Sequence, residues 1–410
     1  MRGLKRVAGT LAPQVAPIAP VAVVARGLAC ATGLGLPALQ TALARGASAL
    51  QANHFSTTPL PTQIGRIAAL DDTRLPMQLT AWDCRATRAA WLGLQADGFI
   101  DAALAAVQHH GTTRVGLVLG TSASTIGASE QAYRSLAPDG GFPAALRSET
   151  LNTLHAVTAF VQQALGTQGP CVTVSTACSS SAKAFAQAER WLRLDLVDAV
   201  VVGGVDVLCE SVLFGFQALG LVSPLPCQPF AATRQGISVG EAAAFVLLQR
   251  GPGALQLIGH GEANDAHHMS SPHPQGLGAE RALDEALARA SLTAGEVDYL
   301  NLHGTATPQN DAIEAALVAR RYAPKVHASA TKGLTGHTMG AAGIVEALIC
   351  LQALETGLCS GSAGSPAADP AMGPLFAQQF QTEAMQAPVS VAASHSFGFG
   401  GNNCVLVLGC

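Results

Sequence analysis

Short runs of β-branched and small apolar residues, each ending at glycine or a small polar residue, constrain the fold of this 410-residue chain most strongly. They read RVGLVLGTSAS, CVTVSTACSSS, VDAVVVGGVD, VDYLNLHGTAT and VSVAASHSFGFGGNNCVLVL. Strands that are apolar along their whole length are typical of a sheet that is buried on both faces. Alanine-rich stretches with helical spacing, such as AERWLRLDLVD and AERALDEALARASL, lie between them. This alternation predicts an α/β architecture in which helices cover mostly parallel strands.

The length of the chain predicts two packed halves, because a single hydrophobic core usually stops growing at about 250–300 residues. The segment QRGPGALQ contains Gly and Pro and is a candidate boundary. We therefore predict an N-terminal half over residues 21–252, a C-terminal half over residues 253–410 and a disordered extension over residues 1–20. The strands ahead of Cys178 and His303 occupy similar places in the two halves, which suggests an internal duplication.

Charged residues are scarce: they make up 12% of the chain, against about 25% in a typical soluble protein. This shortage predicts that a partner subunit covers part of the surface. The formal net charge of -4 and the absence of a basic run argue against nucleic-acid binding. Apolar runs such as VDAVVVGGVDVL and GIVEALICLQAL are shorter than about 18 residues or interrupted by charge, so we expect no membrane span.

The ten cysteines are scattered from Cys30 to Cys410 without a CxxC pair, in a chain far larger than a disulfide-stapled mini-domain. This pattern predicts free thiols in a reducing cytoplasm. The opening segment MRGLKRVAGTLAPQVAPIAP has basic residues ahead of apolar ones, as a signal peptide does. Three prolines and then Arg26 interrupt the apolar stretch, so we expect a disordered extension that leads into a first strand, VAVVARGLA, in a cytoplasmic protein.

In VSTACSSSAKAF, one cysteine, Cys178, stands between a predicted strand and an alanine-rich helix. A thiol at a helix N-terminus meets the positive end of the helix dipole and unpaired backbone N–H groups, and both favour the nucleophilic thiolate. The N–H of Cys178 would also be placed to stabilise an oxyanion. A small buried cysteine in a tight corner is the alternative, and this stretch alone does not decide between the two.

Two further glycine-punctuated loops contain histidine. LHGTATPQND places His303 after a strand, and TKGLTGHTMGAAG supplies Lys332 and His337. Each loop alone also fits a structural histidine or a backbone need for glycine. A thiolate together with two imidazoles suits covalent acyl transfer followed by stabilisation of an enolate.

Zinc is the competing use of Cys and His, but zinc ligands usually come in close pairs. DAHHMSSPHP brings His267, His268 and His273 together without paired thiolates. We therefore expect no metal site.

The blocks TACSSS, LHGTATPQND, TKGLTGHTMGAAG and SFGFGGNNCVLVL, in this order, resemble the signature blocks of the β-ketoacyl-acyl-carrier-protein synthases, which are condensing enzymes. The resemblance runs from about Val21 to Leu408. It implies a thiolase fold, in which two duplicated βαβαβαββ halves form five layers, α-β-α-β-α. It also implies a homodimer, or a heterodimer with a related subunit. Acyl carrier protein would be the partner, delivering substrates on its phosphopantetheine with no other cofactor.

Residues that match the family's motifs take their roles from this resemblance. Cys178 would carry the acyl chain as a thioester. His303 and His337 would assist decarboxylation of the malonyl-carrier protein and stabilise the enolate. Lys332 matches the family's structural and electrostatic lysine, and Glu346 is its expected partner.

Substrate contacts follow from the same resemblance. Phe399 matches the residue whose backbone N–H shares the oxyanion hole with that of Cys178 and whose ring gates the acyl pocket, with Phe397 beside it. Thr305 and Thr307 match the contacts to the pantetheine arm.

Acidic carrier proteins normally dock on Lys and Arg near the tunnel mouth. We expect Arg66 and Arg234 on that surface.

The chain departs from the family pattern in one region. The family usually has PFD followed by GEGAG, whereas this chain has PFAATRQGISVGEAAAF, with Ala231, Ala242 and Ala244 at the altered positions. These changes and the compact connection GFQALGLVSPLPCQPF look more like synthases of aryl-polyene pathways than like housekeeping fatty-acid enzymes. Both pathways stay open.

Three functions therefore compete: a β-ketoacyl synthase, a non-catalytic chain-length partner and a CoA-dependent thiolase. An elongating synthase is favoured over an initiating one, because His337 completes a histidine pair and initiating synthases have Cys-His-Asn. A non-catalytic chain-length partner would usually lack the nucleophilic cysteine. A CoA-dependent thiolase would need a second catalytic cysteine, for which Cys404 is the candidate.

Overall fold

The computed structural model describes residues 15–141, 143 and 150–410. Of the extension predicted over residues 1–20, residues 1–14 lie outside the described part. Residues 15–20 have no regular secondary structure, and the N–H of Ile18 donates to the carbonyl of Arg289 at 3.0 Å. All ten cysteines are described and all are free thiols.

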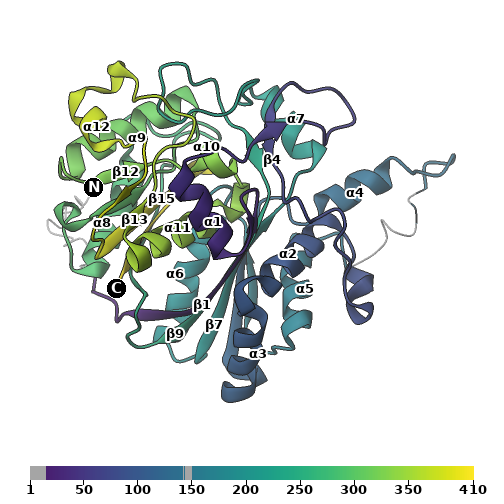
Figure 1. The fold of residues 1–410 in the computed structure, drawn as a ribbon. Helices are drawn as coiled ribbons and strands as arrows, with labels where there is room; N and C mark the ends of the chain where they lie inside the picture. The colour runs from purple at the N-terminus through teal and green to yellow at the C-terminus, as the bar shows by residue number, and fades with distance from the viewer. Residues whose placement is uncertain (1–14, 142, 144–149) are drawn as a thin grey trace, which may run out of the picture.

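Two mixed sheets form the framework (Figure 1). The first has the order β2 (Gly33–Leu34), β1 (Val21–Cys30), β9 (Ala242–Arg250), β7 (Ala199–Asp206), β5 (Val115–Gly120) and β6 (Cys171–Val174). The second has the order β10 (Gln256–Asn264), β16 (Asn402–Gly409), β15 (Val391–Gly398), β11 (Tyr299–Asn301) and β12 (His327–Ser329). The predicted division at residue 252 falls in the connection between β9 and β10.

Apart from the short β2, the two sheets repeat one pattern of strand directions. In the first sheet β9 is antiparallel to β1 and β7, and β5 is parallel to β7 and β6. In the second sheet β16 is antiparallel to β10 and β15, and β11 is parallel to β15 and β12. The chain is therefore an internal duplication. One detail of the prediction was wrong: the counterpart of β6, ahead of Cys178, is β12, whereas β11, ahead of His303, corresponds to β5.

Helices cover both faces of each sheet, which gives five layers. Between the sheets lie α6 (Ser180–Arg193) and α11 (Ala342–Thr356). The outer face of the first sheet carries α2 (Arg85–Gln95), α3 (Phe99–His110) and α5 (Ala156–Leu165). The outer face of the second sheet carries α8 (Leu277–Ala290), α9 (Pro308–Arg321) and α12 (Pro374–Gln379). The predicted thiolase-type arrangement of five layers is confirmed.

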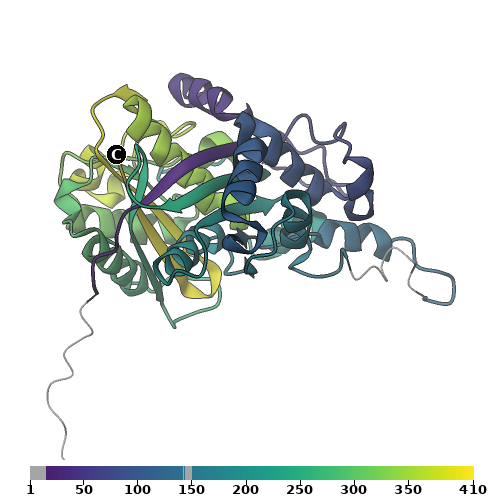
Figure 2. The ribbon, with the colours of Figure 1, turned by 90° about the horizontal axis from the view of Figure 1, so that it is seen from below.

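Strand alternation explains why the sheets are covered on both sides. Along β7, Val200 and Val202 face the middle layer, whereas Ala199 and Val201 face the outer helices. Every second side chain of a strand points to the same face, so a strand that is apolar throughout needs cover on both faces. Figure 2 shows the two halves on opposite sides of the molecule, with the N-terminal strands in purple to teal and the C-terminal strands in green to yellow.

The remaining elements surround the ends of the sheets. They are α1 (Leu36–Arg45), α4 (Ile126–Tyr133), α7 (Glu210–Ala218), α10 (Lys332–Thr335), the sheet of β3 (Gln51–Ala52), β4 (Gln63–Gly65) and β8 (Val239–Gly240), and the pair β13 (Leu358–Cys359) and β14 (Met385–Gln386). Within the described part of the chain, one helical stretch, Met339–Thr356, is long and apolar enough to cross a membrane. However, 89% of it is buried inside the molecule, where it forms the middle layer between the two sheets.

Candidate active site

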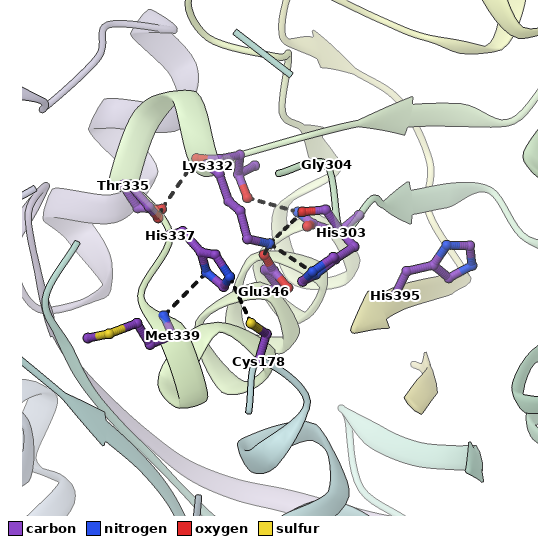
Figure 3. A network of polar contacts seen from close by, with 12 residues as sticks. Cys178, His303, Gly304, Lys332, Thr335, His337, Met339, Glu346 and His395 are labelled. Carbon is purple, nitrogen blue, oxygen red and sulfur yellow. Dashed lines mark hydrogen bonds and ion pairs between the residues drawn. The ribbon is translucent and has the colours of Figure 1, made fainter. Parts of the chain in front are cut away.

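Segments from both halves meet at the carboxyl ends of β6, β11 and β12. Cys178 follows β6, His303 follows β11, and His337 follows α10. The sulfur of Cys178 and one ring nitrogen of each histidine all lie within 4.8 Å of one another, and all three residues are buried (Figure 3). The duplicated fold therefore brings the nucleophile from one half to the imidazoles of the other.

The Cys178 corner is a tight turn between strand and helix. Ala177 has a left-handed backbone with φ of 53°, a conformation that an L-residue adopts only when its surroundings enforce it. The Ser180 hydroxyl donates to the Ala177 carbonyl at 2.5 Å and accepts the Thr176 N–H at 2.9 Å. These bonds close the turn, so Cys178 lies directly ahead of the first turn of α6, as predicted.

The pKa of the Cys178 thiol differs from the prediction. Burial raises the pKa of its thiol to about 11, although the Lys332 charge and the backbone N–H of Phe399, which donates to the sulfur, both lower it. Desolvation disfavours the charged thiolate in a buried site, and here it is the largest influence on the pKa. The raised pKa runs against the expectation, drawn from the helix N-terminus alone, that the corner favours the thiolate.

His337 is held by its backbone and by one ring nitrogen. Its N–H donates to the Ser238 carbonyl at 2.7 Å, and its carbonyl accepts the Gly240 N–H at 2.9 Å. The ring Nδ1 accepts the backbone N–H of Met339 at 3.2 Å, so the neutral ring has its hydrogen on Nε2, 3.0 Å from the sulfur of Cys178. His337 is therefore placed as a hydrogen-bond donor at the reaction centre (Figure 3).

The His303 ring has the same tautomer as the His337 ring, with Nδ1 as acceptor and the hydrogen on Nε2. Nζ of Lys332 lies 3.3 Å from Nδ1 of His303 and donates to the His303 carbonyl at 2.5 Å. An ammonium group can only donate, so Nδ1 accepts and the hydrogen is on Nε2. Burial, followed by the Lys332 charge, holds the pKa of His303 and of His337 well below 6.5. Both rings are therefore neutral donors aimed at one small volume.

Lys332 and Glu346 form the predicted ion pair in the interior. Their side chains are 2% and 4% exposed. Burial raises the pKa of Glu346 to about 7, while the Lys332 charge opposes the rise. Lys332 thus links Glu346 on α11 to the His303 loop, and its charge disfavours protonation of both imidazoles.

Sequence reasoning missed the carboxylate behind His303. Glu314 on α9 is buried and accepts the backbone N–H groups of His303 and Gly304 at 2.8 and 2.9 Å. It also lies 3.0 Å from Nδ1 of His395, whose Nε2 contacts the Tyr322 hydroxyl at 2.9 Å. A buried acid eleven residues after the histidine, on the next helix, was the available signal. It was not recognised because its partner groups belong to the backbone.

A cavity of about 440 Å³ leads to the three reactive groups. Cys178, His303 and His337 line it together with both predicted pantetheine contacts, Thr305 and Thr307. The predicted gate residues Phe397 and Phe399 also line it, and so do Phe216, Leu219 and Leu221 in and after α7 and Ile237 ahead of β8. The ring of Phe399 meets that of Phe216 edge-on, with centroids 6.0 Å apart.

The two arginines predicted for carrier docking are engaged within the chain. The Arg66 side chain is 14% exposed and pairs with Asp71. The Arg234 side chain is 11% exposed and pairs with Asp369 at 2.8 Å. Each guanidinium therefore has a carboxylate partner within the chain, and the role of Arg66 and Arg234 in carrier docking stays a prediction. Asp71 lies only five residues from Arg66, whereas Asp369 lies 135 residues from Arg234, and a count of basic residues revealed neither pairing.

The alternative catalytic cysteine is remote from the site. Cys404 lies in β16, is fully buried among apolar residues and is absent from the cavity lining. Burial raises the pKa of its thiol well above 9.0. This placement removes the structural basis for a thiolase reading, which required a second reactive cysteine.

Comparison with known proteins identifies the family. The model described as beta-ketoacyl synthase, N-terminal domain, matches residues 19–254, and the corresponding C-terminal domain model matches residues 256–365. The chain is 33% identical over 305 residues to nodulation protein E of Rhizobium meliloti (strain 1021), covering 72% of this chain and 75% of that protein. It is 35% identical over 262 residues to 3-oxoacyl-[acyl-carrier-protein] synthase 2 of the same organism, covering 59% and 61%.

A solved structure extends the likeness over almost the whole chain. A ketosynthase (ApeO) in complex with its chain length factor (ApeC) from Xenorhabdus doucetiae matches with a TM-score of 0.86 and 31% identity, covering 95% of this chain and 98% of that one. The ishigamide ketosynthase/chain length factor has the same fold, with a TM-score of 0.84 at 24% identity. With its Cys-His-His centre and duplicated sheets, this chain belongs to the β-ketoacyl synthase family and is a condensing enzyme of the acyltransferase class.

Proposed function

We propose that this condensing enzyme carries an acyl chain as a thioester on Cys178 and extends it with a malonyl unit from acyl carrier protein. The observation that carries the assignment is the grouping of three reactive side chains along one cavity: Nε2 of His337 lies 3.0 Å from the Cys178 sulfur, and a ring nitrogen of His303 lies within 4.8 Å of both. Cys178 supplies the nucleophile, and the imidazoles supply hydrogen bonds for the charge that develops on a thioester oxygen.

Acyl transfer is the first half-reaction. The Cys178 sulfur attacks the acyl-thioester carbonyl, and its proton leaves with the pantetheine thiol of the carrier. The negative charge of the tetrahedral intermediate lies on the former carbonyl oxygen. The N–H groups of Cys178 and Phe399 are the proposed donors to it, since Phe399 N–H already points at the sulfur. Because the free thiol has a pKa of about 11, the proton moves as the carbon–sulfur bond forms rather than beforehand.

Condensation is the second half-reaction. The malonyl thioester loses CO₂, and the electron pair of the broken carbon–carbon bond forms an enolate whose oxygen accepts from Nε2–H of His303 and His337. The enolate carbon then attacks the Cys178 thioester, and the Cys178 sulfur leaves as a thiolate that takes up one proton. Neither imidazole has to change its protonation state, in keeping with pKa values held well below 6.5.

We propose that no metal takes part. The three reactive groups form the one cluster within the described residues that could hold an ion. Coordination through Nε2 would require that nitrogen to lose its hydrogen, while Nδ1 already accepts from Met339 or Lys332. The hydrogen bonds that surround metal-bound histidines normally run the other way, with the distal nitrogen donating. The substrates would arrive on phosphopantetheine, with no further cofactor.

A related subunit is the proposed assembly partner. Within the described residues β6 pairs on one side only, with β5, and Val172 in β6 is 36% exposed. In both views α4 and the residues after it up to 141 project from the body (Figures 1 and 2). Tyr133 and Leu136 on this arm are 56% and 41% exposed. An open strand edge and exposed large side chains on a projecting arm are both features that a second subunit would cover.

The pathway and location are further proposals. The similar ketosynthase from Xenorhabdus doucetiae was solved with its chain length factor, which supports a heterodimer of this kind. The departures at Ala231, Ala242 and Ala244 support an aryl-polyene-type pathway over housekeeping fatty-acid synthesis. A cytoplasmic location fits a chain with ten free thiols.

Malonyl decarboxylation tests the proposed function. The protein is incubated with malonyl-carrier protein, and CO₂ release is followed with and without an acyl donor. Acyl donor should increase β-ketoacyl product at the expense of simple decarboxylation, and the His303→Ala variant should release CO₂ at least about a hundredfold more slowly. CO₂ release by wild type and variant at equal rates would contradict the proposal.

A further inference from the structure

Asp206 is a buried carboxylate that joins the two halves directly behind the reactive groups. It is the last residue of β7 and is 0% exposed. Its Oδ1 accepts the Thr121 hydroxyl at 2.8 Å and the Ala123 N–H at 2.9 Å. Its Oδ2 accepts the Ser122 N–H at 2.8 Å and the Gly340 N–H at 2.7 Å. Three donors thus come from the loop after β5, and the fourth comes from the C-terminal half.

All four partners of Asp206 are donors, so the acceptor-only carboxylate satisfies every one of them. Burial raises the pKa of Asp206, and the four donors lower it. A protonated carboxyl would point its hydrogen at a backbone N–H, or would require the Thr121 hydroxyl to accept where it now donates. The geometry therefore favours the charged form.

The contact with Gly340 depends on close approach of two loops. A Cβ at Gly340 would lie 2.6 Å from the Ser122 nitrogen and 2.7 Å from Oδ2 of Asp206. Glycine is therefore required for the loop after α10 to reach the carboxylate. The preceding residue, Met339, has a φ of 54°, which a methionine adopts only when its neighbours hold it there.

The peptide that Asp206 anchors is next to the one that fixes the His337 ring. Gly340 N–H binds Asp206, and Met339 N–H donates to Nδ1 of His337 at 3.2 Å. That second bond places the ring hydrogen on Nε2, 3.0 Å from the Cys178 sulfur. Without the anchor, the Met339 turn could relax to an ordinary φ, and its N–H would leave Nδ1.

We propose that Asp206 is a positioning residue for the condensation, which sets the tautomer and orientation of His337 through the Met339–Gly340 turn. The inference rests on the proposed role of His337 as a donor to the enolate. Asp206 touches neither substrate nor sulfur. Its effect passes through two backbone N–H groups.

The Asp206→Asn variant tests this role, because it keeps the volume but turns one acceptor oxygen into a donor that faces other donors. We expect malonyl decarboxylation to fall about 10- to 100-fold in kcat, with KM within about twofold of wild type. Glu189→Gln is the matched control: Glu189 is also buried, but it pairs with His260 and Arg193 away from the cavity. Its kcat per folded molecule should stay within about twofold.

Nitrogen-15 NMR of histidine-labelled protein measures the tautomer of His337 directly. Substitution of a residue that only stabilises the fold would leave this tautomer unchanged. The His337 signal is assigned by its absence in His337→Gln. Wild type should show hydrogen on Nε2 and none on Nδ1, and Asp206→Asn should lose this signature while the other assigned histidines keep theirs. Gly340→Ala, which displaces the same peptide without changing a charge, should reproduce both effects and serves if Asp206→Asn does not fold.

The outcomes separate this inference from the proposed function. Unchanged kcat in Asp206→Asn, an unchanged His337 tautomer, or an equal loss in Glu189→Gln would overturn the role of Asp206. If wild type itself failed to decarboxylate malonyl-carrier protein, the proposed function would fail. The tautomer measurement would still decide whether Asp206 positions His337.

Discussion

Two corners of the molecule, one after β6 and one after β12, occupy equivalent places in the duplicated sheets. They nevertheless carry different reactive side chains. In the N-terminal half, Cys178 leads within two residues into the long helix α6. In the C-terminal half, the four-residue α10 and a short loop come before α11, and this extra segment holds Lys332 and His337. One corner presents a nucleophile at a helix start, and the other has room for a cation and a donor.

The two corners are also held differently. Hydroxyl and backbone hydrogen bonds of Ser180 close the Cys178 corner. The C-terminal corner is held by the buried Lys332–Glu346 pair and by the contact of Gly340 with Asp206. The duplicated framework therefore brings the two corners together. The different hydrogen bonds and charges that support each corner fit the different reaction steps that we propose for them.

The largest expected effect concerns the donors of the C-terminal corner. His303→Ala and His337→Ala should each lower malonyl decarboxylation about 10²- to 10³-fold, because each removes one hydrogen bond to the enolate oxygen. Acylation of Cys178 should fall much less, since the proposed donors to its oxyanion are the backbone N–H groups of Cys178 and Phe399. Stopped-flow acylation and CO₂ release measure the two steps separately. Equal losses in both steps would contradict the division of labour between the corners.

Removing the Lys332–Glu346 ion pair should lower the free energy of unfolding more than removing the Ser180 hydroxyl does. Lys332→Met leaves Glu346 unpaired in the interior and should lower the free energy of unfolding by about 3–5 kcal/mol. Ser180→Ala removes one hydroxyl and should cost about 1 kcal/mol. Urea unfolding of both variants measures the difference. Equal costs would show that the two corners are held alike.

The pH dependence of the Lys332→Met deficit is a sharper form of this prediction. Burial already raises the pKa of Glu346 to about 7, and loss of the Lys332 charge should raise it further. A carboxyl whose folded pKa is raised stabilises the fold when protonated, and that contribution is lost as pH rises through the folded pKa. The deficit should therefore be larger at pH 8 than at pH 6. A deficit that shrinks as pH rises would contradict the assignment.

The two imidazoles of His303 and His337 should make the wild-type protein less stable as the pH falls, whereas the raised pKa of Glu346 acts as the pH rises. Both have pKa values held well below 6.5 by burial and by Lys332. Below pH 6.5 the unfolded chain takes up protons that the folded rings do not, so stability should fall by up to about 1.4 kcal/mol per pH unit for each ring. Urea unfolding between pH 6.5 and 5.5 checks this, and His303→Gln should have a shallower slope than wild type. An unchanged slope would show that His303 is protonated in the fold.

The smallest expected effect is at Cys404. This thiol is buried in β16 away from the cavity, so Cys404→Ala should keep the condensation rate within about twofold. A modest loss of stability from the small cavity is expected, and a thermal melt beside the activity assay separates the two. Loss of condensation without loss of fold would revive a thiolase-type second cysteine.

The sequence predicted the framework and the reactive residues because both have local signatures. Apolar strands that end at glycine gave the α/β class, and the motifs around Cys178, His303 and His337 gave the site. The supporting acids were missed, because Glu314 and Asp206 bind backbone N–H groups that only the folded chain brings near. The burial of an individual side chain such as Cys178 cannot be read from its neighbours in the sequence either.

Burial therefore accounts for the unexpected pKa of Cys178. The Cys178 pKa was expected to be low from the helix start alone, yet desolvation raises it to about 11. Arg66 and Arg234 were expected to be available for carrier docking, which stays a prediction, and each is paired with a carboxylate in the folded chain. The burial of Cys178 and the Asp369 partner of Arg234 depend on residues distant in sequence, whereas Asp71 lies only five residues from Arg66.

The central claim is that Cys178 carries the acyl chain while the C-terminal corner handles the malonyl unit. Intact-mass measurement of the protein after incubation with acyl-carrier protein tests it most directly, with Cys178→Ala as the matched variant. We predict that wild type gains the mass of one acyl group, that His337→Ala still gains it, and that Cys178→Ala does not. Acylation of Cys178→Ala to the same extent as wild type would contradict the account.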